Sequence, residues 1–125
     1  MVDERPEFLD AACAWLENEP STSVTGTARD GFEAILAVDK LAPDLVLMSA
    51  FMSRMDGFEA TTAIKRRAKP PIVILLGIHA DSSMEIEASA AGADGFLPKS
   101  EFASRLLPML WAFFARLDVA ADSEI

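Results

Sequence analysis

Apolar residues along this chain follow two spacings in turn, which predicts helices and strands that alternate. Helix-type spacing is clear in residues 6–17, and the runs Asp44–Met48 and Ile72–Leu76 are apolar almost throughout. Strands of that kind are buried on both faces, and helices connect them as parallel strands through right-handed crossovers. In chain order we predict helices at 6–17, 29–42, 55–67, 81–92 and after Ser100, with strands at 23–28, 44–48, 72–76 and 95–99. The pattern therefore indicates an α/β protein with a parallel sheet covered on both sides.

The sequence Asp-Gly-Phe-Glu-Ala occurs twice, at residues 30–34 and 56–60, and each copy begins a predicted helix. In both copies an aspartate takes the N-cap position and a glutamate follows three residues later. Their carboxylates can satisfy backbone N–H groups that the first helical turn leaves free. We therefore interpret Asp56 first of all as a helix cap. The sequences around the two copies differ, so we do not interpret them as an internal repeat.

Composition and charge narrow the classes of function. The chain has 125 residues, enough for one domain with a core, and its net charge of −9 argues against a nucleic-acid-binding surface. A short basic cluster, Lys65–Arg67 with Lys69, falls at the end of a predicted helix, where cations complement the helix dipole. Cys13 is the only cysteine, so no disulfide forms within the chain. No apolar run reaches the about 20 residues that span a bilayer, so we expect a soluble cytoplasmic protein.

In a sheet of this kind the functional crevice lies beyond the carboxyl ends of the strands. The residues expected there are Asp3, Glu4, Ser49, Gly77 and Lys99. We therefore take these as the candidate site.

Five segments and the spacings between them carry a resemblance to a known family. They read VDE at 2–4, RDGFEA at 29–34, PDLVLM at 43–48, MDGFEA at 55–60 and AGADGFLPK at 91–99. Taken together and in this order, the chain resembles the receiver domain of two-component response regulators over essentially its whole length. The resemblance implies a flavodoxin-like, doubly wound five-stranded parallel sheet of order 2-1-3-4-5 in a three-layer α/β/α arrangement. It also implies a single receiver-like domain over residues 1–125, and we expect no output region after the last helix.

The resemblance implies roles for four residues that match the family pattern. Asp3 and Glu4 match the acidic pair that holds Mg²⁺ after the first strand. Lys99 matches the lysine that contacts the phosphoryl group at the end of the fifth strand. Phe96 matches the aromatic residue of that strand, which reports the change that phosphorylation causes.

Two other positions depart from the family pattern. Ser49 stands where the family has the aspartate that accepts a phosphoryl group from a histidine kinase, and Gly77 stands where a Ser or Thr hydroxyl follows that group. Ser53 also replaces a proline that is common in the next loop. A serine hydroxyl is protonated at neutral pH and coordinates Mg²⁺ poorly, and glycine has no side chain to bond a phosphoryl oxygen. We therefore expect no catalytic residue, no enzyme activity, no cofactor and at most weak Mg²⁺ binding by Asp3 and Glu4.

These residues leave three hypotheses for the function. The leading one is a stand-alone receiver-like protein in two-component phosphorelay signalling that acts by protein–protein contact, without phosphorylation. Its partner would be a histidine kinase, a response regulator or a second copy of the chain, with no nucleic acid and no membrane. The alternative is a receiver that still accepts a phosphoryl group with Mg²⁺, at a non-standard residue such as Asp56.

The third hypothesis is a hydrolase in which Lys99 activates Ser49 as a nucleophile. The neighbouring carboxylates of Asp3 and Glu4 disfavour it, because they stabilise the charged form of the lysine. We expect Lys99 instead to pair with these acidic residues, and Ser49 to be a small hydrogen-bonding side chain.

The first predicted strand is short. Only Met1 and Val2 precede Asp3, whereas strands usually run about five or six residues. Either residues upstream complete this strand, or it is truncated and leaves its neighbours partly unpaired. Unpaired edges inside a sheet recruit other chains. The sequence leaves both alternatives open.

The last predicted helix carries two apolar stripes. The first can cover the sheet and consists of Phe102, Leu106, Met109, Leu110, Phe113 and Leu117. The second, which we call the second stripe, consists of Leu107, Trp111 and Phe114. A surface helix is normally polar at such positions, so we predict a partner-binding surface there, including a homodimer through this helix. Burial within the monomer is the alternative, because Pro108 between the stripes could kink the helix and merge them.

Overall fold

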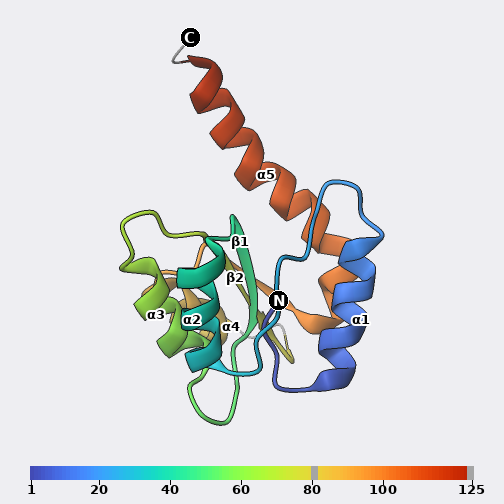
Figure 1. The fold of residues 1–125 in the computed structure, drawn as a ribbon, viewed down its shortest axis with the longest axis vertical. Helices are drawn as coiled ribbons and strands as arrows, with labels where there is room; N and C mark the ends of the chain where they lie inside the picture. The colour runs from blue at the N-terminus through green and yellow to red at the C-terminus, as the bar shows by residue number, and fades with distance from the viewer. Residues whose placement is uncertain (80–81, 124–125) are drawn as a thin grey trace.

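The computed structural model describes residues 1–79 and 82–123, with side chains in the last helix up to Ala115. Helices and strands alternate from α2 onward, whereas α1 and α2 follow each other without a strand between them (Figure 1). In chain order they are α1 (Pro6–Glu17), α2 (Gly31–Leu41), β1 (Leu45–Ser49), α3 (Gly57–Lys65), β2 (Ile72–Gly77), α4 (Ser82–Ala91), β3 (Gly95–Pro98), the 3-10 helix η1 (Lys99–Glu101) and α5 (Phe102–Ser123). No helix in these ranges is both long enough and apolar enough to cross a membrane.

Three parallel strands form the sheet in the order β1-β2-β3. Their registers place Leu47 opposite Ile74 and Leu75 opposite Phe96. The central residues of all three strands are buried, as expected for strands that helices cover on both faces. The predicted α/β class with a parallel sheet is therefore confirmed.

The first two predicted strands are reduced to single-residue bridges. Val2 pairs in parallel with Ala28 on one side and with Met48 on the other. The strand predicted at 23–28 is wrong for the described residues, because this segment pairs in strand fashion only at Ala28. Only Val2 lies alongside this segment in the described part of the chain, so its other residues have no strand to pair with. The predicted order is retained, because Val2 lies between Ala28 and β1.

Two clusters of buried side chains form the core, one on each face of the sheet. Helices α2, α3 and α4 cover the face where Met48, Ile64 and Leu75 are buried. Helices α1 and α5 cover the other face, where Ile74 and Leu106 are buried. Burying each such side chain contributes about 1.5–3 kcal/mol, so this three-layer arrangement holds the strand ends in fixed positions.

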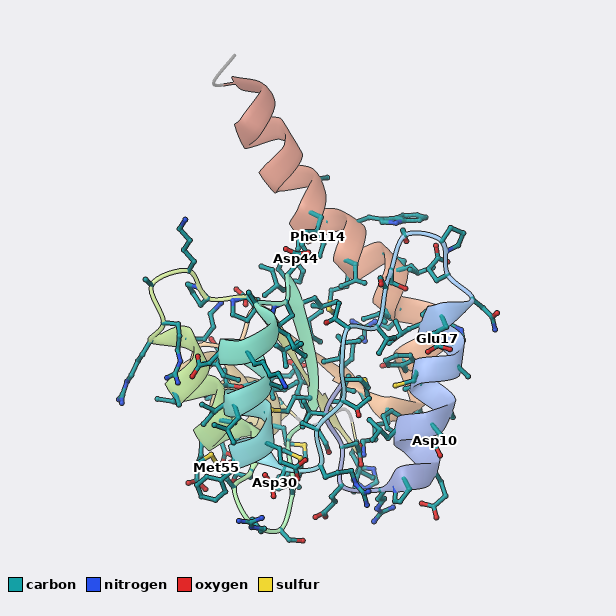
Figure 2. The ribbon with its side chains drawn as sticks, in the orientation of Figure 1. Asp10, Glu17, Asp30, Asp44, Met55 and Phe114 are labelled. Carbon is teal, nitrogen blue, oxygen red and sulfur yellow. The ribbon has the colours of Figure 1, made fainter. Side chains whose placement is uncertain are left out.

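Both helices that begin with Asp-Gly-Phe-Glu-Ala are capped as predicted. The Asp30 side chain accepts a hydrogen bond from the Glu33 backbone N–H at 2.9 Å, and the Asp56 side chain accepts one from that of Glu59 at 2.9 Å. Asp30 lies next to Met55 at the start of these helices (Figure 2). Asp56 is thus a cap in the structure.

The glycine of each motif is needed for close packing. A Cβ atom on Gly57 would overlap the carbonyl oxygen of Ser49, and one on Gly31 would lie 2.7 Å from the carbonyl oxygen of Met55. Both obstacles are backbone atoms, which cannot rotate away. The start of α3 therefore lies directly against the end of β1, where the candidate site is.

Helix α5 continues through Pro108 and extends beyond the sheet (Figure 1). The first stripe covers the sheet as predicted: Phe102, Leu106 and Leu110 are buried, and Met109 and Phe113 pack against them. Leu117 lies outside the described side chains. Pro108 is exposed, and Phe114 of the second stripe packs against the same core cluster as the first stripe.

Replacing Gly57 with alanine tests this packing. The new methyl group meets backbone, so we expect the free energy of unfolding to fall by about 1–3 kcal/mol, the usual cost of overpacking. Gly95→Ala is the matched control, because its Cβ atom would meet the flexible side chain of Met109 at 3.1 Å. Urea unfolding of both variants measures the difference, and equal losses would contradict the account.

Candidate functional site

The predicted site residues meet at one cavity of about 230 Å³. Its lining includes Asp3, Glu4, Ser49, Ser53, Gly77 and Lys99. They come from four places: the residues after Val2, the end of β1 with its loop, the end of β2, and the residue after β3. Parallel strands bring their carboxyl ends to the same edge, so residues far apart in sequence become neighbours.

Asp3 and Lys99 form a buried ion pair. Lys99 Nζ lies 2.7 Å from Asp3 Oδ2, and the Asp3 side chain is only 1% exposed. The backbone N–H of Arg5 donates to Asp3 Oδ1 at 2.8 Å. Among the described residues, Asp3 Oδ2 receives no regular hydrogen bond, so the ammonium supplies the compensation that a buried carboxylate needs. The predicted pairing of Lys99 with an acidic residue is confirmed.

A ring from α1 also positions Lys99. The centroid of the Phe8 ring lies 4.5 Å from Lys99 Nζ, and the face of an aromatic ring attracts a cation. This contact was not predicted, because Phe8 has the spacing of an ordinary core residue in an amphipathic helix. Lys99 is thus held between an aromatic ring and a carboxylate.

Glu4 is held by Ser53. Glu4 Oε2 accepts hydrogen bonds from the Ser53 hydroxyl at 2.6 Å and from the Ser53 backbone N–H at 2.9 Å. These two hydrogen bonds hold the pKa of the Glu4 carboxyl below its ordinary value, and the bond from the hydroxyl has the larger effect. Proline has neither donor, so the serine at this position creates both bonds. The substitution was visible in the sequence, but its partner was not.

Ser49 is buried and makes one long side-chain contact in the described part of the chain. Its hydroxyl lies 3.4 Å from the carbonyl oxygen of Phe51 and does not bond Lys99, which is paired with Asp3. A serine nucleophile needs a base within hydrogen-bond reach. The arrangement therefore gives no support to the Ser–Lys hydrolase hypothesis.

Gly77 and Phe96 fit together at the end of β2. A Cβ atom on Gly77 would lie 2.5 Å from Phe96 Cζ and 2.9 Å from Phe96 Cε2. The ring is buried, with 9% of its surface exposed. The Phe96 ring therefore fills the space that a side chain at position 77 would take.

The donor set for a metal ion is small. Among residues 1–79 and 82–123, no group of three or more His, Cys, Asp or Glu side chains could hold a metal. Asp3 is paired with Lys99, and Glu4 is bound by Ser53. Mg²⁺ prefers oxygen ligands in near-octahedral geometry, so this set does not fit a resident Mg²⁺ ion. Weak Mg²⁺ binding by Asp3 and Glu4 stays a prediction that direct titration would test.

The second stripe lies away from this cavity, on α5. Trp111 is 62% exposed, while Leu107 and Phe114 are half-buried. Phe114 packs against the core on the α1 and α5 face of the sheet. Part of the predicted partner surface is therefore exposed and part lies against the body of the protein.

Comparison with known proteins gives a family match. The family model described as the response regulator receiver domain matches residues 1–110. The signal receiver domain of the response regulator NarL from Mycobacterium tuberculosis has a similar structure, with a TM-score of 0.75 and 31% identity, over 78% of this chain and 79% of that one. This similarity supports the flavodoxin-like fold predicted from the sequence.

Two curated relatives carry longer chains. Protein-glutamate methylesterase/protein-glutamine glutaminase 2 of Methanospirillum hungatei JF-1 is 43% identical over 89 residues, which are 71% of this chain and 25% of the relative. Transcriptional regulatory protein LiaR of Bacillus subtilis strain 168 is 33% identical over 106 residues, which are 85% of this chain and 50% of the relative. The chain thus spans between a quarter and a half of the length of these relatives.

Replacing Lys99 with methionine tests the ion pair. A buried Asp3 carboxylate without its cation should lower the free energy of unfolding by about 1–3 kcal/mol. The double variant Asp3→Asn/Lys99→Met should recover part of that loss, because no charge is then left buried. Arg105→Met is the control, since its exposed pair with Glu101 contributes only about 0–1 kcal/mol. Urea unfolding measures the free energy of unfolding of each variant. If Lys99→Met loses no more of it than the control, the ion pair does not have this role.

Proposed function

Because this chain belongs to the family of response regulator receiver domains, we propose that it is a two-component signalling module that acts by protein–protein contact and does not depend on aspartyl phosphorylation. The support comes from the candidate site and from α5. The activities of the longer relatives are not part of the proposal, because the chain matches only a fraction of their length.

The site lacks the group that would accept a phosphoryl group. Position 49 carries a hydroxyl that faces a backbone carbonyl, with no base in contact in the described residues. The cation of Lys99 is already paired with Asp3. Asp56, the other candidate acceptor, lies at a helix start with its carboxylate bound to a backbone N–H. These contacts favour a structural role for each group.

The observation that carries the proposal is the packing of Phe96 against Gly77. In the family, a hydroxyl at this position follows the phosphoryl group and the aromatic ring reports the change. Here the Phe96 ring is buried in the space beside Gly77, and position 77 has no side chain that could follow a phosphoryl group. The state of Phe96 is then set by packing alone, which makes it independent of a phosphoryl group.

The contact surface we propose is the second stripe of α5. Trp111 offers a large aromatic side chain that is 62% exposed, and Leu107 and Phe114 flank it. Exposed tryptophan side chains are common anchors of protein interfaces. A histidine kinase, a response regulator or a second copy of the chain would meet this surface.

Incubation of the protein with acetyl phosphate and Mg²⁺ tests whether the chain accepts a phosphoryl group and whether Phe96 responds to it. We expect neither the mass of the intact protein nor the NMR signals of the Phe96 ring to change, because no acceptor is present. Gly77→Thr should move those ring signals, since its side chain needs the space that the ring fills. A receiver domain that retains the aspartate serves as the positive control. A hydroxylamine-sensitive phosphoryl adduct on this chain would refute the proposal.

Trp111→Glu tests the contact surface. A buried charge in place of an aromatic anchor should weaken self-association or partner binding by about 2 kcal/mol, which is more than tenfold. Ile86→Glu on α4 is the matched control, because Ile86 is 70% exposed and lies on another helix. Analytical ultracentrifugation and pull-down with a kinase measure both variants. Unchanged association of Trp111→Glu would exclude the second stripe as the contact.

A further inference from the structure

Helix α2 has an outer side that is partly apolar. Phe32 is 47% exposed and Leu36 is 69% exposed, and they lie four positions apart, so they are neighbours on one side of the helix. The opposite side, which includes Ala34, is buried in the core. A surface helix is normally polar on its outer side, and adjacent exposed apolar side chains indicate an interaction site. We use the name α2 face for the outward residues Phe32, Glu33, Leu36 and Lys40.

The Phe32 ring is held in position by its own chain. The guanidinium carbon of Arg54 lies 5.4 Å from the centroid of the ring, and Arg54 Nη1 lies 3.2 Å from Oδ2 of the buried Asp30 side chain. The face of an aromatic ring attracts a cation. A side chain that is already ordered loses less conformational entropy when a partner covers it. Phe32 is therefore a preformed part of the α2 face.

Two charged residues flank Leu36 on the α2 face. Glu33 precedes it by three positions and Lys40 follows it by four, so all three side chains lie along one side of the helix. Neither charged side chain forms an ion pair in the described part of the chain. The neighbouring Asp39, in contrast, is paired with Arg67 at 2.8 Å. The α2 face thus has a carboxylate at one end, an apolar centre and an ammonium at the other end.

We propose that the α2 face joins two copies of this chain, with the two α2 helices packed antiparallel around a two-fold axis beside Leu36. Glu33 of each copy then lies opposite Lys40 of the other copy, and the two Leu36 side chains meet at the centre. The proposal does not rest on the proposed function, because α2 and α5 cover opposite faces of the sheet (Figure 1).

The positions of the two charges select the antiparallel direction. Glu33 and Lys40 are seven positions apart, close to two helical turns, so both lie on the same edge of the α2 face. They are equally far from a two-fold axis that passes between positions 36 and 37, so each meets its opposite charge in the second copy. Parallel helices would instead bring Glu33 to Glu33 and Lys40 to Lys40, and like charges repel. A second copy therefore complements both ends of the face, whereas a partner of uniform charge would be repelled at one end.

The contact between the two helices is short. Eleven residues of α-helix span about 16 Å. Interfaces that bury less than about 1,200 Å² are typical of weak, transient complexes. The net charge of −9 on each copy also opposes association. We therefore expect a reversible dimer that forms at high protein concentration.

Analytical ultracentrifugation of the full chain over a concentration series tests the proposal, in about 0.15 M salt to screen the repulsion between copies. The unchanged protein should dimerise. Leu36→Glu should weaken dimerisation more than about tenfold, because it places two carboxylates at the centre of the interface. Ile86→Glu on α4 is the matched control and should leave dimerisation unchanged, since Ile86 is 70% exposed and Leu36 is 69% exposed.

Exchange of the two charges tests their pairing. Glu33→Lys and Lys40→Glu should each weaken dimerisation, because each single variant places like charges opposite one another. The double variant Glu33→Lys/Lys40→Glu should dimerise like the unchanged protein, and an equimolar mixture of the two single variants should form a mixed dimer. The double variant has the least favourable charges for the helix dipole of α2, so its recovery cannot come from a more stable helix.

Four results would overturn the proposal. They are a monomer at every concentration, a dimer that Leu36→Glu leaves unchanged, a double variant that dimerises no better than the single variants, and single variants that do not recover on mixing. Self-association that is retained in Leu36→Glu and lost in Trp111→Glu would place the contact between copies on α5. Neither the acetyl phosphate experiment nor the kinase pull-down of Trp111→Glu depends on these outcomes, so the proposed function is tested separately.

Discussion

The single rung that Val2 makes with Ala28 and Met48 is the constraint on which the rest of this structure depends. It is the only strand-type pairing that joins the first 28 residues to the sheet in the described part of the chain. It places Asp3 at the carboxyl edge, within an ion-pair distance of Lys99. The geometry of the candidate site therefore depends on one short pairing.

At the candidate site, both acidic side chains are compensated by donors of the same chain. The Asp3 carboxylate has an ammonium, the Glu4 carboxylate has the two donors of Ser53, and Phe96 fills the space beside Gly77. A buried charge without such a partner would be costly, and a void beside the ring would lose packing contacts. The site is thus packed as a structural cluster. That arrangement is consistent with a receiver fold that signals by contact.

Much of the fold followed from local patterns. The helix starts at Asp30 and Asp56 were predicted because caps act over three residues, and the buried strands were predicted because they are apolar throughout. The strand at 23–28 was predicted wrongly, because its local pattern was strand-like but its neighbour was too short to pair with it. The candidate residues were found from the carboxyl ends of the strands. The contacts of Phe8 and Ser53 were missed, because each joins side chains far apart in sequence.

By itself, the sequence determined what each position can do chemically. Ser49 has a hydroxyl where the family pattern has the phosphoryl acceptor, and Gly77 has only a hydrogen atom where that pattern has a hydroxyl, and no folding changes these groups. Only the tertiary structure decided how the neighbours respond, because packing and ion pairing depend on groups that meet across elements. It put the Phe96 ring beside Gly77 and paired Lys99 with Asp3. Side-chain chemistry is fixed residue by residue, whereas the space and the partners of each group are fixed by the whole fold.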